Sequence, residues 1–330
     1  MSYIHHSITH SCKPLPSRDE VLPLPRRPRR NGAVNVQVLG AIFLHTARWL
    51  LRFGYDGAGY FGWARQPSLR TVEGEIRRGV QRHRIATPAA SHRLEVASRT
   101  DRGVSAVGNA LTLTSLLPPS ALLRALNGIA PDIAFTAASE VPDAFRVRKA
   151  VRRVYRYYEP AQGHDFAVWQ STARRFSGTV DVRSLGRGVP AAAPVWRDLE
   201  SVTVTPRTGG ATVEVRAPSF VWGMVRKIIS ALREVEAGRV SLDQLEAALR
   251  GRTRLTLPMA EPERLVLWDV EFPIPWQHRW AGPNRHQARW ERLARDSLWA
   301  REALLEGLTS AAPVIPVQET AFPESMRDER

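Results

Sequence analysis

The sequence predicts an α+β fold, built as two similar halves with mainly antiparallel sheets flanked by helices and joined near residue 145. Two observations support this prediction. With 330 residues, of which 43% are hydrophobic, the chain can bury one large core or two smaller ones. Strand-like runs also occur in antiparallel-looking groups with helices between them, which favours α+β over a doubly wound parallel sheet.

The first half opens on residues 48–55, a strand candidate rich in large apolar side chains. A helix is expected over 71–82. Thr71 is a good N-cap for it, and the apolar residues that follow recur at helical spacing. The other elements predicted here are a short strand at 94–96, a strand at 109–117, a helix at 122–129, a strand at 133–138 and a turn at 142–143.

The second half is predicted to begin with a strand over 145–158, while residues 161–194 carry no predicted element. Arg226 lies in the apolar sequence of a helix expected at 220–232, where it must reach solvent or pair with an acid, since an unpaired buried charge is too costly. The remaining predicted elements are a hairpin of strands 199–204 and 211–216, a helix at 241–250 capped by Ser241, a strand at 265–272 and a helix within 285–308.

These elements divide the chain into four parts. Residues 1–46 are a basic extension in which prolines and arginines alternate, a composition that resists packing and predicts disorder. An N-terminal catalytic subdomain is expected over 47–145 and a C-terminal subdomain over 146–275. Residues 276–330 are expected to form a helical extension with a polar tail.

The charge balance indicates a polyanionic partner. The formal net charge is +15, and nearly all of the positive charge comes from arginine, whose forked guanidinium suits phosphate. Nucleic acid is therefore the default partner. Cys12 is the only cysteine, which argues against a disulfide framework, a zinc site or a catalytic thiol. No apolar run is long enough for a membrane span, and no secretory signal is recognisable, so a cytoplasmic setting is expected.

Residues 57–62 match the pattern G-x-G-x-x-G directly after a predicted strand. A dinucleotide-binding fold needs a helix to open at this point, so that its N-terminus faces the pyrophosphate. Pro67 would interrupt that helix in its second turn. The dinucleotide interpretation is therefore rejected, and a loop that approaches a ligand or another backbone is predicted instead.

Asp101 lies between Arg99 and Arg102 on a segment that turns at Gly103. A carboxylate between cations on a turn is a plausible chemical group, and it is equally a common surface loop. The predicted strand at 145–158 is the second candidate region, because its cations alternate with apolar and aromatic residues. That pattern favours nucleic-acid contact over an ordinary solvated strand face.

Several of these stretches together resemble the TruA-type tRNA pseudouridine synthases, in a form like that of the archaeal members. The resemblance spans residues 47–275, with the motifs in the family's order and spacing. Its motifs are S-R-T-D-R-G-V-S-A at 98–106, Y-D-G-A-G-Y-F-G-W-A-R-Q at 55–66, Y-R-Y at 155–157, F-V-W-G-M-V-R-K-I at 220–228 and the strand ending D-V-E-F at 269–272.

The resemblance implies the pseudouridine synthase fold, with a central basic cleft, and a homodimer that isomerises uridine to pseudouridine. The substrate would be the anticodon stem-loop of tRNA, at positions 38 to 40, with no cofactor or metal. Asp101 would be the nucleophile and Tyr155 the ring that stacks on the uridine. Arg226 would form an ion pair with Asp101, and Arg99 would help to displace the target base.

The chemistry accounts for these residue types. A nucleophilic carboxylate must stay ionised in a pocket that excludes water, and an adjacent arginine favours the charged form. A uridine must leave its stack, which costs a few kcal/mol, and an aromatic ring returns roughly 1–3 kcal/mol per base. The alternatives are a non-catalytic RNA-binding protein on the same fold, an aspartate-based hydrolase, for which a second carboxylate is not evident, and a basic structural protein.

Overall fold

The computed structural model describes residues 46–87, 94–161, 163–207 and 209–282. Nine strands form one sheet, and two more form a small separate one. The strands of the large sheet are β1 (Ala47–Tyr55), β2 (Glu95–Val96), β3 (Ser105–Ser115), β4 (Ile133–Val141), β5 (Arg152–Pro160), β8 (Ser201–Arg207), β9 (Gly210–Ala217), β10 (Leu265–Glu271) and β11 (His278–Arg279). The small sheet pairs β6 (Gly178–Asp181) with β7 (Trp196–Leu199).

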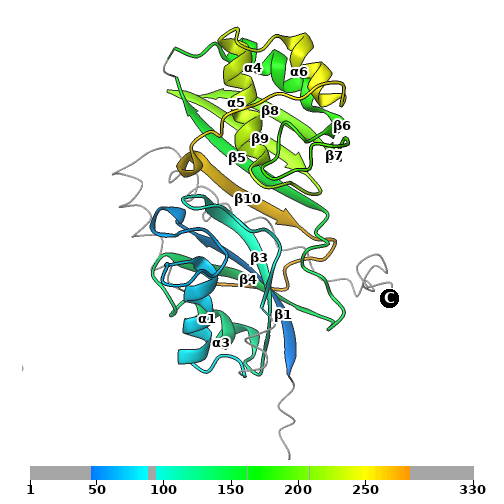
Figure 1. The fold of residues 1–330 in the computed structure, drawn as a ribbon. Coiled ribbons are helices and arrows are strands. Elements are labelled where there is room, and N and C mark those ends of the chain that lie inside the picture. Colours follow the sequence, from blue (N-terminus) through cyan, green and yellow to red (C-terminus); the bar gives the residue numbers. More distant parts are fainter. Residues whose placement is uncertain (1–45, 88–93, 162, 208, 283–330) are drawn as a thin grey trace, which may run out of the picture. The chain divides into compact units, whose positions relative to one another are not determined.

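Helices accompany both ends of the large sheet. They are α1 (Val72–Arg82), α3 (Pro119–Leu126), α4 (Phe166–Ala173), α5 (Met224–Glu236) and α6 (Leu242–Leu249). Figure 1 shows α1 and α3 beside β1, β3 and β4, and α4, α5 and α6 beside β5, β8 and β9. The predicted α+β class, with antiparallel strands flanked by helices, is confirmed.

The strand order is β11-β4-β1-β3-β10-β5-β9-β8, with β2 added beside β3. The two groups of strands that the sequence predicts as separate sheets are therefore parts of one sheet. They join where β10 pairs with β3, a parallel contact that aligns Val266 with Ser105 and Leu267 with Ala106, whereas the other pairs are antiparallel. The division into subdomains at residue 145 stays a prediction, and β11 continues the sheet beyond residue 275.

Capping residues start two helices at the positions that the sequence predicts. The Thr71 hydroxyl accepts a hydrogen bond from the Gly74 N–H at 3.2 Å and starts α1. Ser241 and Gln244 form a reciprocal capping box at the start of α6. α3 starts and ends earlier than predicted. Its start fits Pro119 at the first position, because the fixed φ of proline suits a helix start.

Two predicted elements in the second half have different bounds. β5 begins at Arg152 instead of residue 145, because the preceding residues form turns, with the Phe145 N–H bonded to the Pro142 carbonyl. α5 begins at Met224 and runs to Glu236, instead of spanning 220–232. Gly223 precedes it with a φ of +77°, a left-handed conformation that stops the helix from extending backwards.

Other differences are smaller or concern segments with no prediction. β3 begins at Ser105, four residues earlier than predicted, and β4 extends to Val141. The stretch 161–194, which carries no predicted element, contributes α4 and β6. The helix predicted within 285–308 and nearly all of the 1–46 extension lie outside the described residues.

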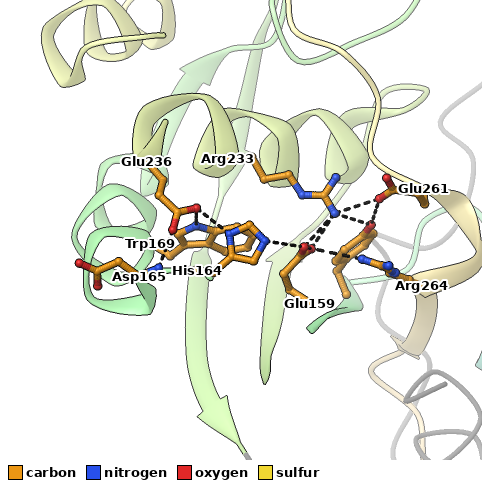
Figure 2. Close-up of polar contacts among 9 residues, drawn as sticks. Glu159, His164, Asp165, Trp169, Arg233, Glu236, Glu261 and Arg264 are labelled. Atoms are coloured by element: carbon orange, nitrogen blue, oxygen red, sulfur yellow. Dashed lines mark hydrogen bonds and ion pairs between the residues drawn. The ribbon is translucent and has the colours of Figure 1, made fainter. Parts of the chain in front are cut away.

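A buried ionic cluster fastens β5 to α5 and to the segment that leads into β10 (Figure 2). The Glu159 carboxylate is 3% exposed, and it lies 2.7 Å from an Arg233 nitrogen and 3.1 Å from His164 Nε2. The same Arg233 nitrogen is 2.9 Å from Glu261, whose carboxylate also accepts a hydrogen bond from the Tyr157 hydroxyl. Arg233 therefore connects three elements that lie far apart in the sequence.

Replacing Arg233 with methionine is expected to lower the free energy of unfolding by about 3 kcal/mol, because a buried carboxylate loses its closest cation. Urea denaturation measures this change. Arg239→Met is the control, since Arg239 pairs with Glu234 from an exposed position with 62% accessibility, and such pairs contribute roughly 0–1 kcal/mol. Equal losses in the two variants would contradict the importance of the buried cluster.

Candidate active site

Asp101 lies on a turn that leads from β2 into β3. The turn closes with a hydrogen bond of 3.2 Å from the Val104 N–H to the Asp101 carbonyl. Gly103 follows with a φ of +81°, which favours glycine. The hydroxyls of Thr100 and Tyr55 lie 2.7 Å apart and anchor the residue before Asp101 to β1. The backbone around Asp101 is thus fixed from several sides.

The glycine-rich loop at 57–62 packs against this turn. A Cβ atom at Gly57 would lie 2.3 Å from the Val104 carbonyl oxygen, and one at Gly62 would lie 2.9 Å from that of Thr100. Only glycine permits such close approach of two backbones. The loop itself contains a short 3-10 turn, Gly57–Gly59, and the next α-helix starts only at Val72. This agrees with the prediction of a loop that approaches another backbone.

Both carboxylate oxygens of Asp101 have partners from the chain around the start of α5. Arg226 Nη1 donates to Asp101 Oδ2 at 3.2 Å, and the indole Nε1 of Trp222 donates to Oδ1 at 2.7 Å. The Asp101 side chain is 25% exposed and that of Arg226 is 15% exposed. Arg226 is itself held by a hydrogen bond of 2.6 Å from Nε to the Ala260 carbonyl. The ion pair implied by the resemblance is therefore present.

These side chains line a cavity of about 1020 Å³ beside the β3–β10 junction. That volume is at the upper end of the roughly 300–1,000 Å³ usual for ligand pockets. All four predicted site residues, Asp101, Arg99, Tyr155 and Arg226, belong to its lining. Four more arginines line it as well: Arg102, Arg148, Arg153 and Arg187. The wall is therefore strongly basic, as expected for a site that receives a polyanion.

Tyr155, on β5, belongs to the cavity lining and is 8% exposed. Its ring packs edge-to-face on Phe220, with centroids 5.0 Å apart and planes at 82°. Burial raises the pKa of Tyr155 to about 12, although a hydrogen bond with Ser98 and the charge of Arg153 oppose this effect. The hydroxyl therefore stays protonated at neutral pH, and the side chain is uncharged.

Two cations of the strand predicted to contact RNA, Arg152 and Arg156, have acidic partners within the protein. Arg152 pairs with Glu200 and Glu271. Arg156 pairs with Glu214 at 2.8 Å, and its guanidinium lies 3.7 Å from the ring centroid of Trp268. Glu271 and Glu214 lie directly opposite these arginines on neighbouring strands, where cross-strand neighbours of opposite charge are within reach. Glu200 lies in the connection before β8.

Arg153 instead binds the segment that precedes Asp101. It is buried, and its guanidinium donates to Ser98 Oγ at 3.1 Å and to the Ala97 carbonyl at 3.1 Å. Burial lowers the pKa of this guanidinium. Its hydrogen bonds fix the segment just before Asp101 against β5. Arg153 is therefore part of the scaffold of the site, which no local sequence pattern indicates.

Sequence reasoning also missed Trp222 and Arg187. Trp222 falls inside the helix predicted over 220–232, so it was assigned to buried helical sequence, whereas it is exposed and contacts Asp101. Gly223 is the one local signal for a break at this point. Arg187 lies in the stretch without predicted elements, and its guanidinium is 4.5 Å from the Trp222 ring centroid.

Within residues 46–87, 94–161, 163–207 and 209–282, no group of three or more histidine, cysteine or acidic side chains is arranged to hold a metal ion. Over the same ranges, every helix is too short or too polar to cross a membrane.

A carboxylate clamped by an arginine in a basic cavity of an α+β fold indicates an enzyme that acts on an anionic substrate. Comparisons with known proteins define the class further. A family model described as tRNA pseudouridine synthase matches residues 172–273. Among solved structures, the archaeal box H/ACA sRNP Nop10–Cbf5 complex aligns with 71% of this chain and 51% of that chain, at 13% identity and a TM-score of 0.32, a likeness too slight to carry weight.

Curated relatives are more similar. The tRNA pseudouridine synthase A of Thermococcus kodakarensis is 38% identical over 225 residues, which are 68% of this chain and 84% of the relative. That of Thermococcus gammatolerans is 35% identical over 263 residues, 78% of this chain and 96% of the relative. The chain therefore belongs to the TruA-type tRNA pseudouridine synthase family, and it is an isomerase of the pseudouridine synthase class.

Proposed function

We propose that this enzyme converts uridine to pseudouridine in the anticodon stem-loop of tRNA, at positions 38 to 40, with Asp101 as the nucleophile. One observation carries the proposal. Asp101 lies in a basic cavity with each carboxylate oxygen held by a nitrogen donor. The names of the curated relatives supply tRNA as the substrate class, and the sequence resemblance supplies the positions.

The reaction is an isomerisation with a closed balance. The bond between uracil N1 and the ribose C1′ breaks, the base turns, and a bond forms between C5 and C1′. The proton on C5 leaves and N1 gains one. No electrons are gained or lost overall, so the balance calls for no redox cofactor. A carboxylate nucleophile divides this change into two easier steps.

Each of the other candidate residues has a role that its position supports. Arg226 fixes one carboxylate oxygen of Asp101 and supplies the opposite charge. The Tyr155 ring offers the flipped uridine a stacking surface in place of its lost neighbours. Arg99 is exposed at the cavity wall, where a guanidinium can enter the stack that the target base leaves.

The basic cavity suits a tRNA backbone, because arginine binds phosphate through two parallel hydrogen bonds. On the strength of the family resemblance, we extend the proposal to a homodimer in the cytoplasm. Light scattering of the purified protein measures the assembly, and a monomeric mass would contradict the dimer. Fractionation of cells followed by immunodetection tests the compartment.

Release of tritium from tRNA transcripts labelled at C5 of uridine tests the proposed activity, because the C5 proton leaves only when pseudouridine forms. We expect release from a transcript with uridines at positions 38 to 40. A transcript with cytidine at these three positions is the control. Binding without release would favour the non-catalytic RNA-binding alternative, and equal release from both transcripts would exclude the assigned positions.

Replacing Tyr155 with leucine is expected to slow pseudouridine formation about tenfold to a hundredfold, since stacking contributes roughly 1–3 kcal/mol per base. Tyr155→Phe keeps the ring and should slow the reaction less than threefold. Single-turnover tritium release measures both rates. Equal losses in the two variants would instead assign the effect to the hydroxyl, which hydrogen-bonds with Ser98.

A further inference from the structure

Trp222 is placed where packing does not require it. Its side chain is 55% exposed, the largest exposed fraction among the large hydrophobic residues that the structure describes. Folding gains little from an indole in water, since stabilisation scales with the apolar area removed from solvent. The backbone beneath it is nevertheless well fixed, because the Arg187 N–H donates to the Trp222 carbonyl at 2.8 Å.

Contacts with two neighbouring side chains also fix the indole of Trp222. The Arg187 guanidinium lies 4.5 Å from its ring centroid, a distance typical of a cation–π contact. The indole N–H has no acceptor function and can only donate. It donates to Asp101 Oδ1 at 2.7 Å, a short bond to an anionic acceptor.

Trp222 and Arg226 are four residues apart, and each donates a hydrogen bond to a different carboxylate oxygen of Asp101. An aspartate with a single partner keeps a broad range of rotation about its last torsion. Two donors that start from one fixed segment remove that freedom and set the plane of the carboxylate. Orientation of this kind matters for a nucleophile, because a displacement of about 1 Å can cost about a hundredfold in rate.

We propose that Trp222 is a positioning residue for Asp101, whose indole N–H fixes the carboxylate in the orientation needed for the chemical step. This inference rests on the proposed function of Asp101. It assigns a role to the N–H group and none to stacking of the ring on RNA. The N–H should therefore affect the rate of reaction of bound tRNA and leave the affinity for tRNA unchanged.

Two variants separate the donor from the ring. Trp222→Phe keeps an apolar ring and removes the N–H, and Trp222→Leu removes both. We expect both variants to slow single-turnover tritium release roughly tenfold, because one hydrogen bond to a charged group is lost. The dissociation constant for tRNA, measured by filter binding, should change less than twofold. The thermal midpoint should stay at the wild-type temperature, since the side chain is exposed.

Trp196→Phe is the matched control, because Trp196 is 45% exposed and does not belong to the cavity lining. It should react at the wild-type rate. Wild-type speed in Trp222→Phe with weak tRNA binding in Trp222→Leu would overturn the proposal in favour of a stacking role. Wild-type speed and affinity in both variants would overturn it outright. Failure of the wild-type protein to release tritium would instead refute the proposed function.

Discussion

Replacing Asp101 with alanine is expected to reduce pseudouridine formation by about a thousandfold or more, while tRNA binding stays within a few-fold of wild type. The variant removes the only group to which a covalent role is assigned, and losses of this size are usual when a nucleophile is deleted. Binding should persist because the arginines of the cavity wall are untouched. Tritium release measures the rate, and filter binding measures the affinity.

Glu263→Gln is the control for Asp101→Ala. It removes a negative charge from the lining of the same cavity and leaves the Asp101 contacts intact. Less than a tenfold change is expected. If Asp101→Ala retained wild-type activity, Asp101 would be only an ion-pair partner of Arg226 and the nucleophile would have to be sought elsewhere. If both variants lost activity equally, the effect would come from the charge of the cavity.

Replacing Arg226 with methionine is expected to lower the rate about a hundredfold. Asp101 would lose its ion pair with Arg226, and a hydrogen bond to a charged group contributes roughly 1.5–3 kcal/mol. The bond from Arg226 to the Ala260 carbonyl would be lost as well. Arg226→Lys should recover part of the rate, since it restores a charge without the forked geometry.

Lys227→Met is the matched control for Arg226→Met. Lys227 is the next residue of α5, and its ammonium donates to the Gly186 carbonyl at 3.3 Å instead of to Asp101. The Lys227→Met variant removes one positive charge from the same helical turn and should change the rate less than threefold. Thermal melting of both variants shows whether α5 stays packed. Equal rate losses would mean that the charge of the helix matters and the Asp101 contact does not.

Local signals in the sequence were sufficient for part of this structure. Thr71 and Ser241 mark two helix starts correctly, because a cap is a bond between groups two or three residues apart. Pro67 was enough to reject the dinucleotide interpretation of the glycine loop. Motif resemblance brought Asp101, Tyr155 and Arg226 together as candidates, and the structure brings all three to one cavity.

Other features depend on partners that no local pattern reveals. The alternating cations of β5 suggest an RNA track, yet Arg152 and Arg156 pair with acids on β9, on β10 and in the connection before β8. Periodicity states which side of a strand a side chain occupies, but it does not state which side chains lie opposite on the neighbouring strand. The register of the sheet decides that, and register is a property of the folded chain.

By itself, the sequence determined the α+β class and the family, and it singled out Asp101 as the candidate carboxylate of the site. Only the tertiary structure decided that β10 joins β3, that Arg153 fastens the Asp101 turn, and that Trp222 holds the second oxygen of Asp101. The contacts of Asp101 with Trp222 and Arg226 span 121 and 125 residues of sequence. Such contacts form because separate elements pack into one core, and packing is set by the whole fold instead of by neighbouring residues.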